Sequence, residues 1–161
     1  MRHMLLAAVM VAALAACGQG ETQAPSSSSS APATAQAARS TEEIQAAVAA
    51  LAAPYSEADY EAGRRVFAQC RSCHTINAGG QNRVGPNLHG VFGREIGAVE
   101  GFNYSQAVQD ANFTWDAAQL DHWLANPQTF LPGNRMAFAG VRDETQRRDL
   151  IAYLMIETAA E

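Results

Sequence analysis

The most specific chemistry in this sequence is carried by two cysteines and a histidine within five consecutive positions. They form the run Cys70-Arg71-Ser72-Cys73-His74, a C-x-x-C-H motif. Two thiols at this spacing can each add across a haem vinyl group, and the adjacent histidine can then supply an axial nitrogen to the iron. The motif is therefore typical of the covalent attachment of a c-type haem.

Two other kinds of site use a C-x-x-C pair, and the rest of the sequence argues against both. A thioredoxin-like redox pair is expected within a βαβ pattern, which is missing around residues 70–73. A structural zinc site needs a second pair of ligands, and the only other cysteine, Cys17, belongs to the N-terminal leader. We therefore predict one covalently bound haem c as the cofactor.

The second axial ligand of the iron is predicted to be a methionine. Met155 falls inside an expected helix, where methionine usually serves packing, whereas Met136 lies in a turn-rich loop 62 residues after His74. A histidine–methionine pair suits electron transfer, because the sulfur raises the reduction potential and both axial positions are filled. His89 and His122 are the competing ligands. We expect a structural hydrogen bond for His89 and a solvent-exposed or helix-capping position for His122.

The N-terminus is predicted to be a targeting segment. Its apolar run, residues 4–16, is shorter than the roughly 20 residues of a membrane-spanning helix and fits a secretory signal. The segment ends Leu14-Ala15-Ala16-Cys17, which resembles the lipobox of bacterial lipoproteins. That resemblance implies removal of residues 1–16 as a lipoprotein signal peptide and lipidation of Cys17. The alternative is ordinary signal cleavage, which would leave a soluble carrier with a stray thiol.

Composition divides the rest of the chain into a linker and one domain. Residues 17–54, rich in alanine, serine and proline, are the expected lipid-anchored linker, and residues 55–161 are the expected domain. Ser40 and Glu43 resemble a capping box, so a short helix over 41–53 is predicted, either packed on the domain or transient in the tether. The formal charge of −5 argues against nucleic acid as a partner.

Three helices are expected in the domain, at residues 57–69, 115–126 and 143–157, from apolar side chains at helical spacing. Thr114 is the predicted N-cap of the second helix and Asp143 that of the third. The long segment between the first two helices is rich in glycine and turn signals and has no sustained strand alternation. The sequence therefore predicts a small all-α domain with long loops.

Five segments of the domain resemble class I cytochrome c of the mitochondrial type, in matching order and spacing over about residues 60–158. They are Cys70-Arg71-Ser72-Cys73-His74-Thr75, Gly85-Pro86-Asn87-Leu88-His89-Gly90, Phe92-Gly93-Arg94, Pro132-Gly133-Asn134-Arg135-Met136 and Asp149-Leu150-Ile151-Ala152-Tyr153-Leu154. The resemblance implies the class I cytochrome c fold, with the helices and loops wrapped around one haem.

The resemblance also implies roles for side chains around the haem. Pro86 would offer its carbonyl to the free ring nitrogen of His74 and so fix the orientation of the ligand. Phe138 would cover the haem edge. A buried haem propionate would be held by Arg94, Tyr104 and Trp115, and the first and last helices would cross through Gly63, Phe67, Leu150 and Tyr153.

Three residues near the expected haem depart from the family pattern. Trp123 stands where the family usually has a tyrosine whose hydroxyl touches the methionine sulfur, and an indole can donate but not accept a hydrogen bond. Asn134 replaces a usual threonine, and Val108 replaces a usual asparagine near the propionates. We expect these changes to alter the environment of the sulfur and the buried water.

The sequence has no lysine, although members of this family usually dock through a ring of lysines around the haem edge. The corresponding rim keeps only Arg83, Arg135 and Arg142 as candidate docking residues. Gln81, Gln128 and Thr129 stand at other rim positions, and Asp143 and Glu144 follow Arg142 directly. Electrostatic steering should therefore be weak. We hypothesise that membrane anchoring through Cys17 replaces long-range attraction by supplying a high effective concentration.

These features favour a one-electron carrier that is not an enzyme. It is expected to act as a monomer on the periplasmic side of a bacterial membrane, with the inner membrane favoured. The expected partners are respiratory complexes, a quinol–cytochrome c reductase as donor and a terminal cytochrome c oxidase as acceptor. The alternatives are a fixed electron-transfer subunit of one complex and, less favoured, a haem peroxidase.

Overall fold

The structure, a computed structural model, describes residues 39–160, which belong to one compact unit of the chain, Gln36–Glu161. Regular structure in this range is helical, apart from an isolated bridge between Glu95 and Thr114. The prediction of an all-α domain is thus confirmed. No helix in the described range is long and apolar enough to cross a bilayer. The predicted signal peptide, Cys17 and the predicted linker up to residue 38 lie outside the described residues.

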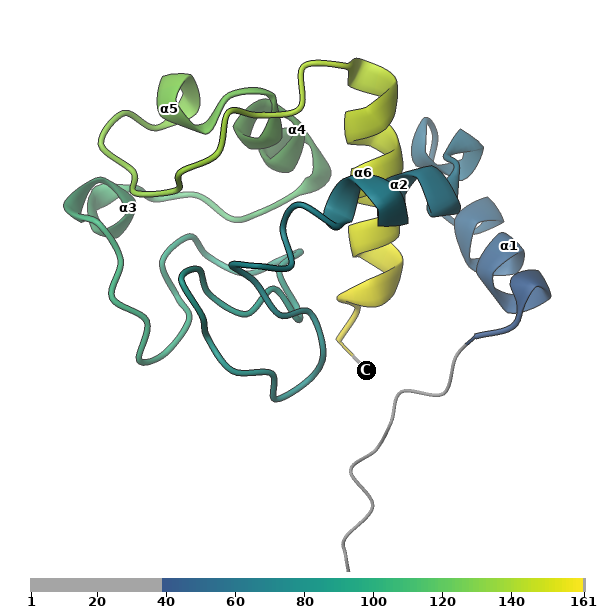
Figure 1. The fold of residues 1–161 in the computed structure, drawn as a ribbon, viewed down its shortest axis with the longest axis horizontal. Helices are drawn as coiled ribbons and strands as arrows, with labels where there is room; N and C mark the ends of the chain where they lie inside the picture. Colours follow the sequence, from purple (N-terminus) through teal and green to yellow (C-terminus); the bar gives the residue numbers. More distant parts are fainter. Residues whose placement is uncertain (1–38, 161) are drawn as a thin grey trace, which may run out of the picture. The chain divides into compact units, whose positions relative to one another are not determined.

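The helices α2 (Tyr60–Phe67) and α6 (Glu144–Glu157) cross each other (Figure 1). Their crossing packs an early segment of the unit against its last helix. Asp143 caps α6, as predicted, by accepting a hydrogen bond from Gln146 N–H at 2.8 Å. The first helix begins later than predicted, because Asp59 accepts from Ala62 N–H at 2.9 Å and so caps α2 at that point. The 3₁₀ turn η1 (Tyr55–Glu57) precedes it.

A glycine allows the two crossing helices to approach closely. A Cβ atom added to Gly63 would lie 2.1 Å from the carbonyl oxygen of Asp149 and 2.8 Å from Cβ of Tyr153. Beside this contact, the rings of Phe67 and Tyr153 pack with their centroids 5.4 Å apart, and Leu150 is fully buried. The crossing that the family resemblance implied is therefore present.

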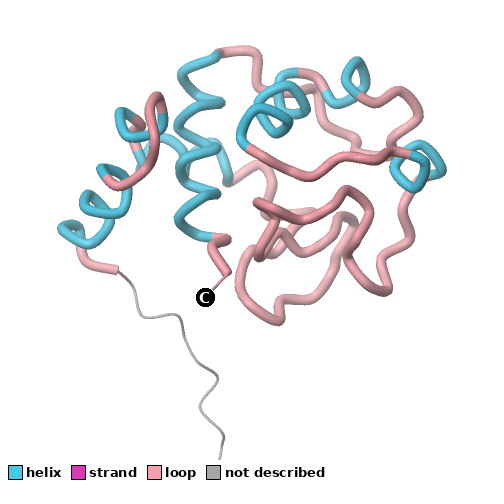
Figure 2. The backbone as a smooth tube through the Cα atoms, turned by 180° about the vertical axis from the view of Figure 1, so that it is seen from behind, coloured by secondary structure: helices cyan, strands magenta, loops and turns pink. Residues whose placement is uncertain are grey.

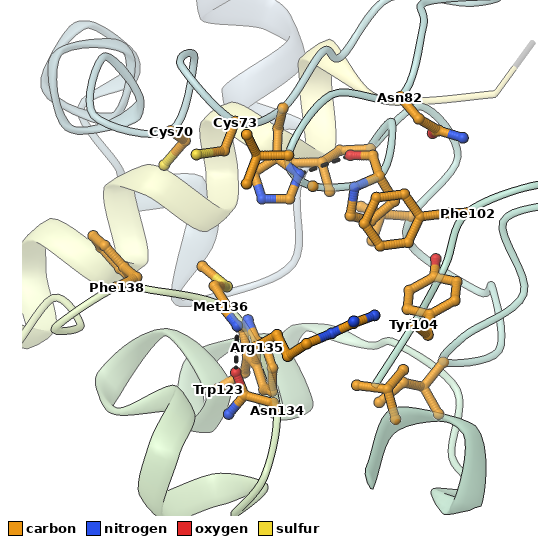
Figure 3. Close-up of a pocket in the computed structure, with 18 of the residues that line it drawn as sticks. Cys70, Cys73, Asn82, Phe102, Tyr104, Trp123, Asn134, Arg135, Met136 and Phe138 are labelled. Carbon is orange, nitrogen blue, oxygen red and sulfur yellow. Dashed lines mark hydrogen bonds between the residues drawn. The ribbon is translucent and has the colours of Figure 1, made fainter. Parts of the chain in front are cut away.

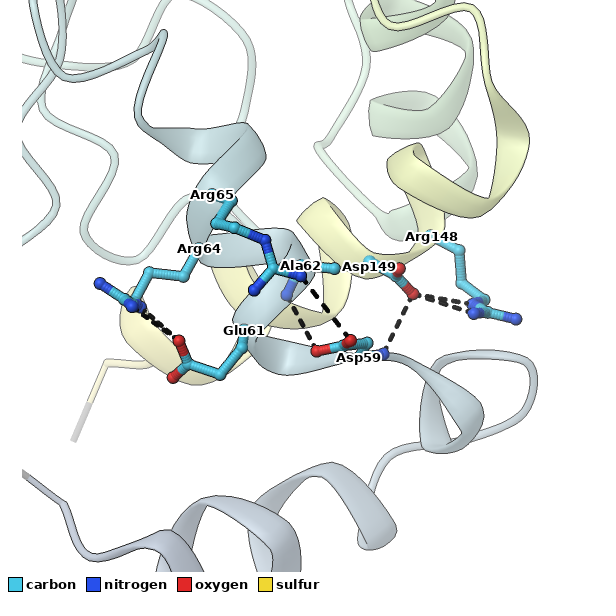
Figure 4. A network of polar contacts seen from close by, with 7 residues as sticks. All are labelled: Asp59, Glu61, Ala62, Arg64, Arg65, Arg148 and Asp149. Carbon is cyan, nitrogen blue, oxygen red and sulfur yellow. Dashed lines mark hydrogen bonds and ion pairs between the residues drawn. The ribbon is translucent and has the colours of Figure 1, made fainter.

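Polar contacts reinforce the crossing on one side (Figure 4). The carboxylate of Asp149, which is buried, accepts hydrogen bonds from Asp59 N–H at 3.1 Å and from Arg148 Nη2 at 2.9 Å. This carboxylate ties the start of α2 to the middle of α6. The neighbouring pairs Glu61–Arg64 and Asp59–Arg65 are exposed, and such pairs contribute little to stability.

A further helix, α1 (Thr41–Ala49), packs against η1 and α6. Ser40 and Glu43 form the predicted capping box. Val48 is buried in the contact, and Arg39 Nη1 forms an ion pair with Glu157 of α6 at 2.5 Å. Of the two arrangements predicted for this segment, the structure has the helix packed on the domain.

The remaining helices are α3 (Gln106–Asp110), α4 (Ala117–Ala125) and α5 (Pro127–Phe130). Neither α3 nor α5 was predicted from the sequence. The prediction of Thr114 as the cap of α4 was wrong, because Thr114 pairs with Glu95 and the cap is Asp116, which accepts from Gln119 N–H at 2.7 Å. Between α2 and α3 the chain forms loops and turns, as predicted (Figure 2).

Candidate haem-binding site

A cavity of about 720 Å³ lies between these loops and the helices α2, α4 and α6. Its size falls within the roughly 300–1,000 Å³ that is usual for cofactor pockets. Apolar side chains from all three helices face it, among them Phe67, Leu120, Leu124, Leu150 and Leu154. The cavity can therefore exclude water from a large apolar ligand.

Cys70 and Cys73 lie together at one side of the cavity (Figure 3). The chain after α2 continues as a helical turn, in which the backbone N–H groups of Cys73 and His74 donate to the carbonyl of Cys70 at 3.1 and 2.9 Å. This turn brings both sulfurs and the imidazole to the same cavity. Neither cysteine is paired in a disulfide within residues 39–160, so both sulfurs are available to a ligand. Burial, with a smaller contribution from Cys73, raises the pKa of the Cys70 thiol to about 11.

The imidazole of His74 is held in one orientation by its neighbours. Its Nδ1 donates to the carbonyl of Pro86 at 2.7 Å, as the resemblance implied. Gly85 lies against the ring, since a Cβ atom there would be 2.2 Å from Cε1. Burial lowers the pKa of His74, and the hydrogen bond to Pro86 opposes that shift. The lowered pKa favours the neutral ring, and the bond from Nδ1 to Pro86 leaves Nε2 available as a ligand.

Met136 faces the cavity from the side opposite the two cysteines (Figure 3). It lies in the predicted loop, after a turn in which Gly133 has a φ of 87°. The competing side chains do not line the cavity: neither His89, His122 nor Met155 is among its lining residues. His122 is exposed, as predicted.

A cation and two aromatic side chains line another part of the cavity. Arg94 is half-buried and donates to the carbonyls of His89 at 2.9 Å and Asn87 at 3.1 Å. No carboxylate within residues 39–160 forms an ion pair with it. Burial lowers the pKa of Arg94, although the guanidinium keeps its charge at any ordinary pH. Tyr104 and Trp115 line the same cavity, so this corner suits an anionic group of a ligand.

The three departures from the family pattern all line the cavity, as does Phe138. Trp123 is buried and packs edge-on against Trp115, with ring centroids 5.5 Å apart. Val108 is buried on α3. Asn134 is also buried and uses its side-chain amide in hydrogen bonds to several neighbours, which sequence reasoning did not foresee. An asparagine two residues before the expected ligand is a signal for this, because Asx turns use that spacing.

Two of the three predicted docking arginines are tied to backbone near the cavity. Arg83 Nη1 donates to the carbonyl of Arg71 at 2.6 Å. Arg135 Nη2 donates to the carbonyl of Asn103, which also lines the cavity. Arg142 is exposed and lies outside the cavity lining. All three side chains are exposed, so their guanidinium groups can reach a partner.

Comparison with known proteins identifies the family. The sequence model described as cytochrome c matches residues 60–156. The chain belongs to the cytochrome c family. It is 41% identical over 106 residues to cytochrome c of Kluyveromyces lactis, a match that covers 65% of this chain and 96% of the relative. It is 44% identical over 107 residues to cytochrome c2 of Blastochloris viridis, covering 66% of this chain and 84% of the relative. Cytochrome c-550 of Ancylobacter novellus is 44% identical over 95 residues, covering 57% and 89%.

Membership of the cytochrome c family confirms three predictions: the helical cytochrome c fold, one covalently attached haem c, and an electron carrier rather than an enzyme. The residues present fit that cofactor. The apolar cavity combines two cysteine sulfurs, an oriented neutral imidazole, a thioether and the guanidinium of Arg94, which forms no ion pair among residues 39–160. Thioether attachment, axial ligation and neutralisation of a propionate require these chemical groups.

Proposed function

We propose that this cytochrome c carries single electrons between respiratory complexes at the periplasmic face of a bacterial membrane, to which lipidated Cys17 anchors it. The donor would be a quinol–cytochrome c reductase and the acceptor a terminal cytochrome c oxidase. Its homology to mitochondrial cytochrome c and bacterial cytochrome c2 supports such a mobile carrier. The lipobox-like sequence that ends at Cys17 supports the anchor.

Each side chain at the cavity has a proposed task. Cys70 and Cys73 would bind the haem covalently, and His74 and Met136 would be its axial ligands. When bound, the haem supplies a one-electron iron couple. Arg94, with Tyr104 and Trp115, would neutralise and bind a propionate. Phe138 and Trp123 would exclude water from the cavity, and Asn134 would support the loop that bears Met136.

One observation carries this proposal: the cavity is lined by a fixed imidazole at the cysteine side and by a thioether at the opposite side. The Pro86 carbonyl holds the proton on Nδ1 of His74, so Nε2 keeps its lone pair for the metal. With a thioether on the other side, both axial positions would be filled and no position would remain for substrate. This arrangement suits electron transfer and not peroxidase chemistry.

The ligand assignment can be tested by exchanging either methionine for leucine. Met136→Leu should abolish the methionine–iron charge-transfer band of the ferric protein and lower the reduction potential, because the sulfur ligand favours ferrous iron. Met155→Leu is the matched control, since Met155 does not line the cavity, and should retain the band. Retention of the band in Met136→Leu would disprove the assignment.

The role of the anchor can be tested with Cys17→Ser, which cannot be lipidated at that position. The reduced full-length protein and this variant would be oxidised by native membranes across a range of ionic strength. Anchoring should make oxidation of the full-length protein faster and nearly independent of salt, because the tether supplies the local concentration. Equal oxidation rates for the two proteins would refute the proposal that the anchor takes over the role of electrostatic steering. Co-purification from native membranes separates a mobile carrier from a fixed subunit.

A further inference from the structure

We propose that Gln128 and Asn134 act together as a clamp on the backbone of Met136 and so slow the loss of this residue from the haem iron. The inference rests on the proposed function, in which Met136 is the axial ligand. Both residues are positioning residues, since they act through Met136. Neither the family resemblance nor the comparisons assign such a role to them.

The first half of the clamp is the buried carboxamide of Asn134. Its Oδ1 accepts a hydrogen bond from Met136 N–H at 2.8 Å. Its Nδ2 donates to the carbonyls of Pro127 and Leu131, both at 2.8 Å. Pro127 begins α5 and is itself buried, so one side chain joins Met136 to the fixed end of this helix.

The second half is the carboxamide of Gln128, which comes from α5. Its Nε2 donates to the carbonyl oxygen of Met136 at 3.1 Å and to Oδ1 of Asn134 at 3.3 Å. The N–H and the C=O of Met136 are thus both bound by side-chain amides, and the two amides contact each other. Phe138 N–H donates to the same carbonyl at 3.0 Å, which uses its second lone pair.

The flanking residue strengthens this arrangement. The side chain of Arg135 extends away from Asn134 and Met136 (Figure 3), and it donates to the carbonyl of Asn103, another residue that lines the cavity. Met136 can leave the iron only if its loop moves. That movement breaks the hydrogen bonds of Met136 to Asn134 and to Gln128 together. Each broken bond that leaves a buried group without a partner raises the cost of opening. The clamp should therefore act on the rate of opening.

The experiment measures how fast imidazole replaces methionine in the ferric holoprotein, followed by loss of the methionine–iron band. At saturating imidazole this rate reports the opening of the loop. Gln128→Ala should increase it about 2- to 12-fold, the range expected for the net loss of one hydrogen bond. Asn134→Thr, which introduces the usual family residue, should increase it by roughly 10- to 100-fold, because the bond to Met136 N–H is lost together with the side-chain donor to the carbonyls of Pro127 and Leu131, each of which keeps one backbone donor.

Two controls separate a clamp from general destabilisation. Gln146→Ala makes the same chemical change at an exposed position in the first turn of α6, and its rate should equal that of the wild type. Denaturant unfolding of each variant measures global stability. The double variant should show a smaller effect than the product of the single effects, because the two amides share Met136.

The outcomes distinguish this inference from the function on which it rests. Absence of a methionine–iron band in the wild type would overturn both. A normal band, with wild-type replacement rates in Gln128→Ala, would overturn the clamp alone. The clamp alone would also be overturned if each increase in the replacement rate, expressed as a free energy, merely equalled the loss of unfolding free energy. Gln128 is exposed, so its variant should fold even if Asn134→Thr does not.

Discussion

Replacement of Gly63 by alanine should destabilise the domain, although alanine is the better helix former. The new Cβ atom would lie 2.1 Å from the carbonyl oxygen of Asp149, whereas ordinary contacts begin near 3.4 Å. The helices α2 and α6 would therefore have to separate by about 1.3 Å, the difference between those two distances. The close contact is with backbone, so no side-chain rotation relieves it.

The size of the effect follows from the contacts that this separation weakens. Phe67 is almost fully buried against Tyr153, and complete removal of such a side chain costs about 3–5 kcal/mol. A gap of about 1 Å forfeits roughly a quarter to a half of the contact energy, or about 1–2.5 kcal/mol. Weakening of the bond from Asp59 N–H to Asp149 adds about 1 kcal/mol. The gain in helix propensity offsets about 1 kcal/mol.

The expected net loss is about 1–2.5 kcal/mol, which lowers the thermal midpoint of a domain of this size by roughly 3–15 °C. Thermal and denaturant unfolding of the ferric holoprotein, followed by circular dichroism, measure this loss. Ala62→Gly, one residue earlier in α2, measures helix propensity by itself and should cost about 1 kcal/mol. The sign decides the matter: if Gly63→Ala were as stable as the wild type or more so, the close approach of the helices would be refuted.

Three further predictions concern the ends of the central crossing and the iron ligand. Burial and the hydrogen bond to Glu157 raise the pKa of Tyr60, so the native state favours the neutral phenol. The folding stability that results is present below about pH 10, the pKa of an unperturbed tyrosine, and it falls as the pH rises further. Tyr60→Phe should flatten this alkaline decline in denaturant melts at pH 8–11, and an unchanged slope would contradict the assignment. Asp149→Ala should lose about 1.5–3 kcal/mol of unfolding free energy. Asp149→Asn should lose less, because the asparagine can still accept from Asp59 N–H. Equal urea midpoints for the wild type and both variants would argue against this. Because the chain has no lysine, loss of the proposed ligand Met136 at alkaline pH should be delayed or use another ligand. An ordinary amine-ligated product in a pH titration of the methionine–iron band would contradict this.

The sequence alone predicted those elements whose position is determined by nearby residues. Asp143, followed by an apolar stripe, defined α6, and the C-x-x-C-H run defined the position of the cavity. Thr114 and Asp116 are both good capping residues, so propensity could not choose between them. The choice depends on the bridge from Thr114 to Glu95, a contact that is distant in sequence.

Other features depended on contacts that a single sequence does not reveal. The capping box predicted that α1 could form, but its contacts are with η1 and with α6, and the ion pair beside it joins Arg39 to Glu157, 118 residues later. Asn134 was recognised only as a departure from the family pattern. Its contacts with Pro127, Leu131 and Met136 arise because the loop folds back onto the start of α5.

The docking of α1 has a practical consequence for preparing a soluble form of this cytochrome c. The family match begins at residue 60, and a protein cut there or at Tyr55 would lack α1. Such a protein would lose the helix that packs against η1 and α6, with its buried Val48, and would remove the cationic partner of Glu157. A soluble form should therefore begin ahead of Arg39, so that the helix and its ion pair remain part of the purified material.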